Sequence, residues 1–295
     1  MQILDGGMGR QLQRIGAPFR QPEWSALALI EGPEFVRQAH ADFITAGADI
    51  VTTNSYALVP FHIGEEAFEK QGGNLMDLAG LLARQAASDA DREVVVAAGI
   101  PPLFGSYAPA DFDASRAGAL FTQFEERLLP HCDVVLAETM ASTAEVAAFL
   151  NAFSNSGLPL WVSLTLDDSE ARWLAPKLRS GEPLELALQL IDSLGAEALL
   201  FNCSQPEVMA DAVRLAGVTL ANTCPIGVYA NAFPPIGGDG AANETLNEVR
   251  DDLTPARYAE FASLWADLGA TIVGGCCGVG PEHVAALADL KVAAR

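Results

Sequence analysis

Three cysteines carry the clearest chemical signal in this chain of 295 residues. Cys276 and Cys277 are adjacent within the glycine-flanked segment Gly274–Gly278, and Cys203 lies far upstream after a short apolar run. Zinc held by four protein ligands is usually structural, whereas three ligands plus an exchangeable position is the catalytic pattern. Packing explains a lone cysteine well, because free cysteine is among the most buried residue types. A glycine-flanked pair with a third thiol instead predicts a zinc site with one open position.

Such a site favours chemistry on a thiol substrate. A free thiol has a pKa near ~8.5, and metal coordination produces the nucleophilic thiolate outright. Three thiolates around Zn²⁺ leave one net negative charge, so a substrate thiolate would be held loosely and stay nucleophilic, which suits alkyl transfer better than hydrolysis. Hydrolytic zinc sites usually contain His or Glu ligands, and the four histidines show no ligand-pair spacing. We expect Cys132 and Cys224 to be packing residues.

Two acidic residues are candidates for binding a cationic group. Asp5 opens an Asp-Gly-Gly motif after the first apolar run, and Glu138 follows the run Val134–Ala137. Asp-Gly is common in turns, but glycine also lets the backbone approach a ligand closely. The amides of Gly6 and Gly7 could therefore hold a carboxylate while Asp5 holds an ammonium. Together the two acids would recognise an amino acid by its ammonium, and zinc would recognise its thiol.

Short apolar runs that read as strands alternate with longer amphipathic segments that read as helices. The predicted strands are Gln2–Leu4, Asp49–Thr53, Val94–Ala98, Val134–Ala137, Leu160–Leu164, Ala198–Phe201, Ile226–Tyr229 and Thr271–Val273. The predicted helices are Glu34–Ala46, Leu75–Ala87, Ser115–Leu129, Ser142–Phe153, Pro183–Leu194, Pro206–Leu215, Pro255–Leu268 and Pro281–Leu290. This alternation predicts an α/β fold with a parallel sheet and crossover helices. Eight such units predict a single-domain (β/α)₈ TIM barrel over residues 1–295, and a doubly wound open sheet is the alternative.

Polar residues and glycines follow nearly every predicted strand. In chain order these strand ends carry Asp5, Thr52–Tyr56, Gly99, Glu138, Ser163, Asn202 with Cys203, Tyr229 and Gly274–Gly278. Barrel enzymes place their chemistry at the C-terminal ends of the strands. The pattern therefore predicts one site that gathers the cysteines and both acids.

Composition excludes several classes of partner. The net charge of −21 opposes nucleic-acid binding, which needs clustered Lys and Arg. No apolar stretch approaches the ~20 residues that span a bilayer, and the N-terminus lacks a secretory pattern. We therefore expect a cytoplasmic protein with small-molecule substrates and no membrane partner. Neither a Gly-x-Gly-x-x-Gly motif after a strand nor a Walker loop is present, so nucleotide cofactors find no support.

The chain resembles the homocysteine S-methyltransferase family, zinc-dependent barrels that methylate homocysteine to methionine. The motifs that carry the resemblance are Leu4-Asp5-Gly6-Gly7, Trp24-Ser25-Ala26, Ala46–Asp49 with Thr52–Tyr56, Glu138-Thr139, Asn202-Cys203 and Gly274–Gly278. They extend from residue 4 to residue 278, so the resemblance covers essentially the whole chain.

The resemblance implies a role for each matched residue. Cys203, Cys276 and Cys277 would bind zinc, while Asp5 and Glu138 would contact the amino group of homocysteine. The amides of Gly6 and Gly7 would contact its carboxylate. Further substrate contacts are expected from Trp24, Thr53, Ser55, Asn202 and Tyr229. The Trp24 motif looks most like that of the small branch that uses S-methylmethionine or S-adenosylmethionine, without folate or cobalamin domains.

Three loops depart from the family pattern, and we expect them to border the methyl donor. They are Gly6–Arg10, Gly99–Gly105 and Tyr229–Phe233. Aromatic side chains could hold an onium donor by cation–π contacts worth roughly 0.5–2 kcal/mol each; the candidates are Trp24, Tyr56, Tyr107 and Phe233. Two alternatives are a related zinc-thiol methyltransferase using a betaine or sulfonio-acid donor, and a non-enzymatic zinc or redox protein.

Overall fold

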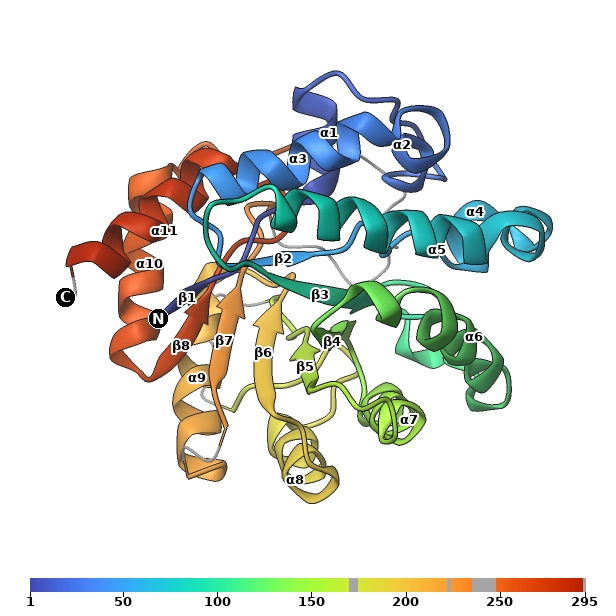
Figure 1. Ribbon diagram of the computed structural model, residues 1–295. Coiled ribbons are helices and arrows are strands. Elements are labelled where there is room, and N and C mark those ends of the chain that lie inside the picture. Colours follow the sequence, from blue (N-terminus) through green and yellow to red (C-terminus); the bar gives the residue numbers. More distant parts are fainter. Residues whose placement is uncertain (170–174, 222–223, 235–247, 294–295) are drawn as a thin grey trace.

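Eight parallel strands form a barrel in the computed structural model (Figure 1), which describes residues 1–169, 175–221, 224–234 and 248–293. Neighbouring strands follow one another in chain order from β2 to β8, and β8 pairs with β1. A bridge between Leu4 and Ile50 closes the ring between β1 and β2. The strands are β1 Gln2–Ile3, β2 Ile50–Thr52, β3 Val95–Ile100, β4 Val134–Met140, β5 Leu160–Leu164, β6 Ala198–Asn202, β7 Ile226–Tyr229 and β8 Ala270–Val273. The predicted (β/α)₈ fold is confirmed, and the open-sheet alternative is wrong.

Helices surround the strands on the outside of the barrel (Figure 1). The longer ones are α3 Pro33–Thr45, α5 Glu65–Ser88, α6 Ala114–Arg127, α7 Thr143–Phe153, α8 Leu184–Leu194, α9 Pro206–Thr219, α10 Pro255–Asp267 and α11 Pro281–Ala293. The shorter ones are α1 Met8–Arg14, α2 Ala26–Glu31, α4 Pro60–Ile63, and the 3₁₀ turns η1 Pro109–Asp111 and η2 Leu129–His131. Side-chain caps begin α6, α7 and α10, where Asp113, Ser142 and Thr254 accept from backbone amides. Ser142 accepts from the amide of Glu145 at the start of α7, while its hydroxyl donates to the Glu145 carboxylate.

Two apolar layers stabilise the barrel. The inner layer fills the barrel and consists of Leu4, Ile50, Ala97, Val134, Leu136, Ala198, Leu200, Tyr229 and Ile272. It is tightly filled, because a Cβ on Gly227 would lie only 2.7 Å from Leu200. The outer layer lies between the strands and the helices and includes the fully buried Phe149 and Trp265. Successive side chains of a strand point to opposite faces, so each strand contributes to both layers.

Two elements differ from their predicted bounds in ways that matter. Helix α5 begins ten residues before the predicted Leu75. Gly72 and Gly73 do not interrupt it, and Gly72 packs against Phe68 within the helix. Strand β4 continues past Ala137 to Met140, and its pairing with β5 shifts register between these two residues. A shift of this kind bends a strand and redirects its side chains. It falls on Glu138, one of the predicted site residues.

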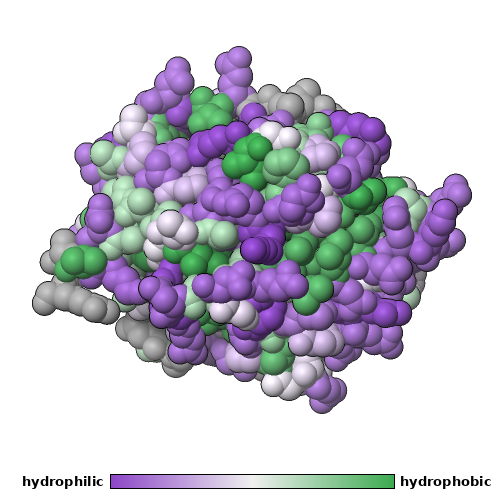
Figure 2. Space-filling model, turned by 45° about the horizontal axis from the view of Figure 1, so that its top comes forward, coloured by the Kyte–Doolittle hydropathy of each residue, from purple (hydrophilic) through white to green (hydrophobic). Residues whose placement is uncertain are grey.

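The outer surface is mixed in polarity. On the face in Figure 2, hydrophilic side chains are interspersed with smaller hydrophobic groups. Among the described residues, no helix is both long enough and apolar enough to cross a bilayer.

Candidate metal centre

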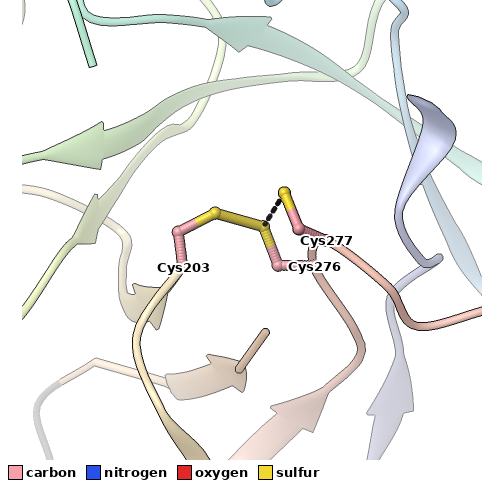
Figure 3. A group of neighbouring side chains, drawn as sticks. All are labelled: Cys203, Cys276 and Cys277. Carbon is pink, nitrogen blue, oxygen red and sulfur yellow. Dashed lines mark hydrogen bonds between the residues drawn. A yellow bond between two sulfur atoms is a disulfide. The ribbon is translucent and has the colours of Figure 1, made fainter. Parts of the chain in front are cut away.

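The three predicted cysteines lie together at the C-terminal end of the barrel. Cys203 follows β6, while Cys276 and Cys277 belong to the loop after β8. Their sulfur atoms all lie within 4.8 Å of one another (Figure 3). Parallel strand ends meet at one edge of a barrel, so residues 73 positions apart in the chain become neighbours.

One sulfur–sulfur spacing in the cluster fits a zinc ion. Zn–S bonds of about 2.3 Å at tetrahedral angles separate sulfur atoms by about 3.8 Å, and the Cys276 and Cys277 sulfurs lie 3.9 Å apart. In this structure Cys203 and Cys276 are joined by a disulfide. Because the thiolate is the metal ligand, that bond must be reduced before the cluster can bind a metal.

Burial keeps the third thiol neutral. Burial raises the pKa of Cys277 to about 11, with Glu138 adding to the rise and Arg10 opposing it. A thiol with such a pKa is almost wholly protonated at neutral pH and is a poor nucleophile. Cys277 would therefore need a bound metal ion to ionise it before it could act as a thiolate ligand.

Glycines let the first loop pack directly on the cysteine loop. A Cβ on Gly6 would lie 2.5 Å from the Val279 carbonyl, and one on Gly7 would lie 2.6 Å from the Cys276 carbonyl. The Gly7 amide donates to the Val279 carbonyl at 2.9 Å, so the protein itself uses this predicted carboxylate contact. These two glycines therefore let the backbone of the first loop come close to the backbone of the cysteine loop.

A buried tyrosine that the sequence analysis did not single out binds the same loop through its hydroxyl. The hydroxyl of Tyr258, on α10, lies 3.0 Å from the Ala230 carbonyl and 2.8 Å from the Gly274 carbonyl. It therefore connects the loop after β7 with the start of the cysteine loop. A tyrosine on the apolar face of an amphipathic helix reads as packing, so the sequence carries no signal for this role.

The two predicted acids face the same cavity. Asp5 accepts from the Thr52 amide at 2.8 Å, and Tyr229 donates to Glu138 at 3.4 Å. Burial raises the pKa of Asp5 to about 7, against the lowering effect of the Thr52 hydrogen bond. Burial and the neighbouring charge of Asp5 raise the pKa of Glu138 to about 8. Such a pair of desolvated carboxyls suits a cationic ligand that would share their charge.

The raised pKa values predict that the metal-free protein is less stable at higher pH. The folded state holds the protons of Asp5 and Glu138 more tightly than the unfolded chain, whose values are 3.8 and 4.5. Their burial therefore destabilises the fold progressively as the pH rises from 3.8 to about 7 for Asp5 and from 4.5 to about 8 for Glu138, and the loss levels off above these values. We expect the urea midpoint to fall less between about pH 5 and about pH 8 in Asp5→Asn and Glu138→Gln than in the parent protein. An identical fall in all three proteins would contradict the shifts.

Most of the predicted site residues line one cavity. The lining residues include Asp5, Gly6, Gly7, Trp24, Thr53, Glu138, Asn202, Cys203, Tyr229, Cys276 and Cys277. Gly99 makes room for Glu138, because a Cβ there would lie 2.6 Å from its carboxylate. Arg10, Tyr56, Tyr107 and Phe233 also line the cavity. Two of the three loops that depart from the family pattern, Gly6–Arg10 and Tyr229–Phe233, supply lining residues. Gly99–Gly105 supplies none and approaches the cavity only where Gly99 lies against Glu138.

Two predicted substrate contacts are used by the barrel itself. Ser55 is fully buried, is not among the lining residues, and donates to the Gly99 carbonyl. In this arrangement Ser55 supports the backbone at Gly99, and its contact with substrate stays a prediction. The Asn202 side chain accepts from the Thr139 amide at 3.0 Å and from Ser163 at 2.8 Å. Because Thr139 has a positive φ of 60°, this network holds the backbone next to Glu138.

Arginines already cover two of the four aromatic candidates. Arg179 lies 4.1 Å from the ring centroid of Tyr107, and Arg10 lies 5.4 Å from that of Phe233. Trp24 instead packs edge to face against Tyr56 at 5.9 Å. An arginine on one ring face draws on the same electron density that a ligand cation would use. The Trp24–Tyr56 pair is therefore the better candidate for holding a cationic ligand.

Cys132 and Cys224 stay apart from the cluster. Cys132 is buried in the outer apolar layer with its thiol against the Leu128 carbonyl. Cys224 is half-buried and packs against the same layer. Both positions fit the predicted packing role.

Comparison with known proteins gives a consistent result. The family model described as homocysteine S-methyltransferase matches residues 2–290. Homocysteine S-methyltransferase 1 of Brassica oleracea var. italica is 28% identical over 316 residues, covering 98% of this chain and 93% of the relative. The selenocysteine methyltransferase of Astragalus bisulcatus is 24% identical over 321 residues, covering 96% and 90%.

Solved structures give the same picture. The homocysteine methyltransferase MmuM from Escherichia coli, in metallated and oxidized forms, matches with a TM-score of 0.80 and 27% identity over 98% of this chain and 96% of that one. The structural likeness therefore covers nearly the whole length of both chains. With the family model spanning residues 2–290, this chain belongs to the homocysteine S-methyltransferase family.

Proposed function

We propose that this protein transfers a methyl group from a small onium donor to the thiolate of homocysteine, giving methionine, with zinc held by Cys203, Cys276 and Cys277. One observation carries the proposal: three sulfur atoms within 4.8 Å border a cavity that also holds two buried carboxyls. A metal held by the sulfurs would bind a thiol, and the carboxyls would bind an ammonium. A ligand that carries both groups is a thiol amino acid. Zinc bound there would keep the substrate thiol deprotonated at neutral pH.

The side chains bind and orient homocysteine. Asp5 and Glu138 receive its ammonium, which compensates the carboxylate charges that burial otherwise disfavours. Asn202 and Thr139 hold the backbone beside Glu138 in place. Fixing both ends of the substrate limits its motion, so its sulfur meets the donor methyl in a near-attack position.

The transfer itself is a direct displacement. The homocysteine thiolate attacks the methyl carbon in line, so a new sulfur–carbon bond forms while the donor's methyl–sulfonium bond breaks. The electron pair of the broken bond goes to the leaving sulfur, which becomes a neutral thioether. The thiol proton has already passed to solvent, and no general acid is required.

The natural compartment follows from the thiol chemistry. Three reduced thiols persist in a reducing environment, so we propose the cytoplasm as the site of this activity. Product analysis tests the function. The reduced, zinc-loaded protein is incubated with homocysteine and either S-methylmethionine, S-adenosylmethionine, glycine betaine or methyltetrahydrofolate, and methionine is measured. Methionine formed from a sulfonium donor supports the proposal, and methionine formed with methyltetrahydrofolate alone would overturn the onium donor.

Replacing Trp24 should weaken donor binding specifically. Trp24→Leu removes a ring that lines the cavity and packs on Tyr56, and cation–π loss is of order 1 kcal/mol. We expect the KM for the sulfonium donor to rise about fivefold while the KM for homocysteine stays unchanged. Phe61→Leu is the matched control, because Phe61 is 46% exposed and does not line the cavity. Equal rises in both KM values would show that Trp24 only shapes the cavity.

A further inference from the structure

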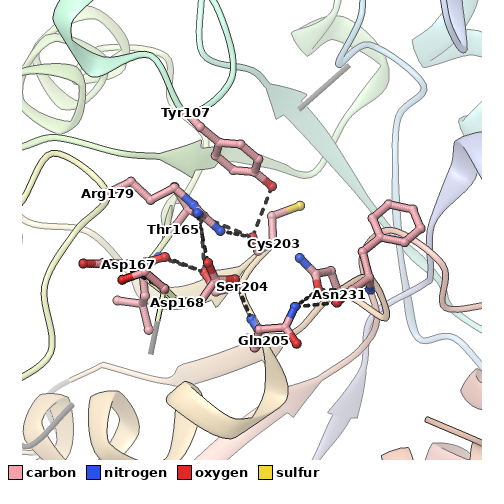
Figure 4. Close-up of polar contacts among 12 residues, drawn as sticks. Tyr107, Thr165, Asp167, Asp168, Arg179, Cys203, Ser204, Gln205 and Asn231 are labelled. Atoms are coloured by element: carbon pink, nitrogen blue, oxygen red, sulfur yellow. Dashed lines mark hydrogen bonds and ion pairs between the residues drawn. The ribbon is translucent and has the colours of Figure 1, made fainter. Parts of the chain in front are cut away.

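A buried arginine holds the backbone of Cys203, although the proposed chemistry does not use it. Arg179 lies in the segment after β5, which folds back so that Leu178 bridges Leu166. Its guanidinium donates to the Cys203 carbonyl at 3.0 Å and to the Thr165 hydroxyl at 3.0 Å (Figure 4). Only 10% of the Arg179 side chain is exposed. The charge of an arginine that is this deeply buried depends on its protein contacts in place of water.

The position of the guanidinium is itself fixed. Asp168 is wholly buried and pairs with Arg179 at 3.1 Å. The other carboxylate oxygen of Asp168 accepts from the Gln205 amide at 3.1 Å, at the start of α9. Separating a buried ion pair would leave each charge uncompensated. The two side chains are therefore held against each other. The anchor of Arg179 therefore spans the loops after β5 and β6.

A second donor reaches the same carbonyl. The Tyr107 hydroxyl donates to the Cys203 carbonyl at 3.1 Å, and its ring packs against the Arg179 guanidinium. Figure 4 shows the two side chains converging on the backbone of Cys203. Tyr107 comes from the loop after β3, so Cys203 is held by side chains from two loops other than its own.

The backbone of Cys203 needs such support. Its φ is +50°, in the left-handed region that costs a residue with a side chain about 1–3 kcal/mol. This conformation sets the direction of the Cα–Cβ bond and thereby the place of the sulfur. Donors that fix the Cys203 carbonyl fix the rotation of the peptide plane that follows it. The orientation of the thiol is then held by contacts that never touch the sulfur.

We propose that Tyr107, Asp168 and Arg179, here called the Cys203 clamp, form a positioning device that holds Cys203 in the conformation that aims its sulfur at Cys276 and Cys277. The clamp acts on a metal ligand, so this inference rests on the proposed zinc site. Metal sites require ligand distances within about 0.2 Å. Outer partners that orient ligands typically contribute 10- to 100-fold in metal affinity, as order-of-magnitude values.

The test measures metal binding directly. The reduced proteins are titrated with zinc against a competing chelator, and with Co²⁺ while the thiolate-to-cobalt absorption is recorded. We expect Arg179→Met to lower zinc affinity about 10- to 100-fold and to change the cobalt spectrum, because one sulfur no longer sits at its place. Met keeps an unbranched apolar stem but removes every donor.

Arg92→Met is the matched control. Arg92 also donates to two backbone carbonyls, those of Ile44 and Ala48, at 2.8 and 2.7 Å, and lies 3.7 Å from Asp49. These contacts precede β2 and β3, at the opposite end of the barrel from the cysteines. We expect this variant to keep the parent zinc affinity and cobalt spectrum.

The outcomes separate the clamp from the zinc site itself. Parent protein that binds no zinc rejects the proposed function. Parent protein that binds zinc, with Arg179→Met unchanged in affinity and spectrum, overturns the clamp. If Arg179→Met does not fold, Tyr107→Phe decides, because it deletes only the hydroxyl. We then expect a several-fold loss of zinc affinity with unchanged thermal unfolding of the metal-free protein, and parent affinity in Tyr107→Phe overturns the clamp.

Discussion

Cys277→Ala should abolish methyl transfer and leave the protein with little zinc. Cys277 is the one member of the cluster outside the disulfide in this structure, and its sulfur lies 3.9 Å from that of Cys276. The reduced parent protein should hold about one zinc per chain through three thiolates, and two remaining ligands cannot keep the metal against a chelator. Metal analysis by mass spectrometry and methionine formation should fall together, the latter by at least about 100-fold.

Two other cysteines provide matched controls. Cys132→Ala and Cys224→Ala remove thiols that lie outside the cluster, in or against the outer apolar layer. Both variants should retain zinc and turnover, because neither sulfur reaches the cavity. A Cys277→Ala protein with full zinc and full activity would remove Cys277 from the ligand set and, with it, the open-position reading of the site.

Asp5→Asn and Glu138→Gln should weaken homocysteine binding while leaving zinc in place. Each replacement removes a charge-assisted hydrogen bond to the ammonium, worth about 1.5–3 kcal/mol, which corresponds to a KM rise of roughly 10- to 150-fold. The loss is expected on the substrate side, because both side chains reach the cavity but neither belongs to the sulfur cluster. Steady-state kinetics at saturating donor measures it.

A thiol without an ammonium separates recognition from shape. With 4-mercaptobutyrate, which lacks only the amino group of homocysteine, the parent protein and both variants should show similar KM values. Zinc content serves as the control for integrity of the site. Equal losses with both thiols would mean that the carboxyls shape the cavity and do not recognise the ammonium.

The strands and their order were predictable from the sequence because they depend on local pattern. A strand buried on both faces appears as a continuous apolar run, and β5 and β7 begin and end at the predicted residues. The alternation with amphipathic segments then predicts a parallel barrel. Since barrel strands deliver their C-terminal ends to one edge, the convergence of Asp5, Glu138 and the cysteines could be expected without coordinates.

The orientation of Glu138 was not predictable in this way. The register shift between Ala137 and Met140 depends on how β4 pairs with β5, and apolar runs carry no information about pairing register. The same limit applies to Ser55, whose place at a strand end predicted a substrate contact. Its hydroxyl donates to the carbonyl of Gly99, 44 positions away, and no local pattern predicts that partner.

By itself, the sequence determined the barrel, the gathering of three thiols and two acids at one end, and the family. Only the tertiary structure decided which neighbours hold them. Arg179 and Tyr107 reach the Cys203 carbonyl from 24 and 96 positions away in the chain. Nothing in the local spacing of either residue distinguishes it from a surface arginine or a packing tyrosine. Local pattern follows from the period of the backbone, whereas such contacts exist only after the barrel closes and brings its loops together.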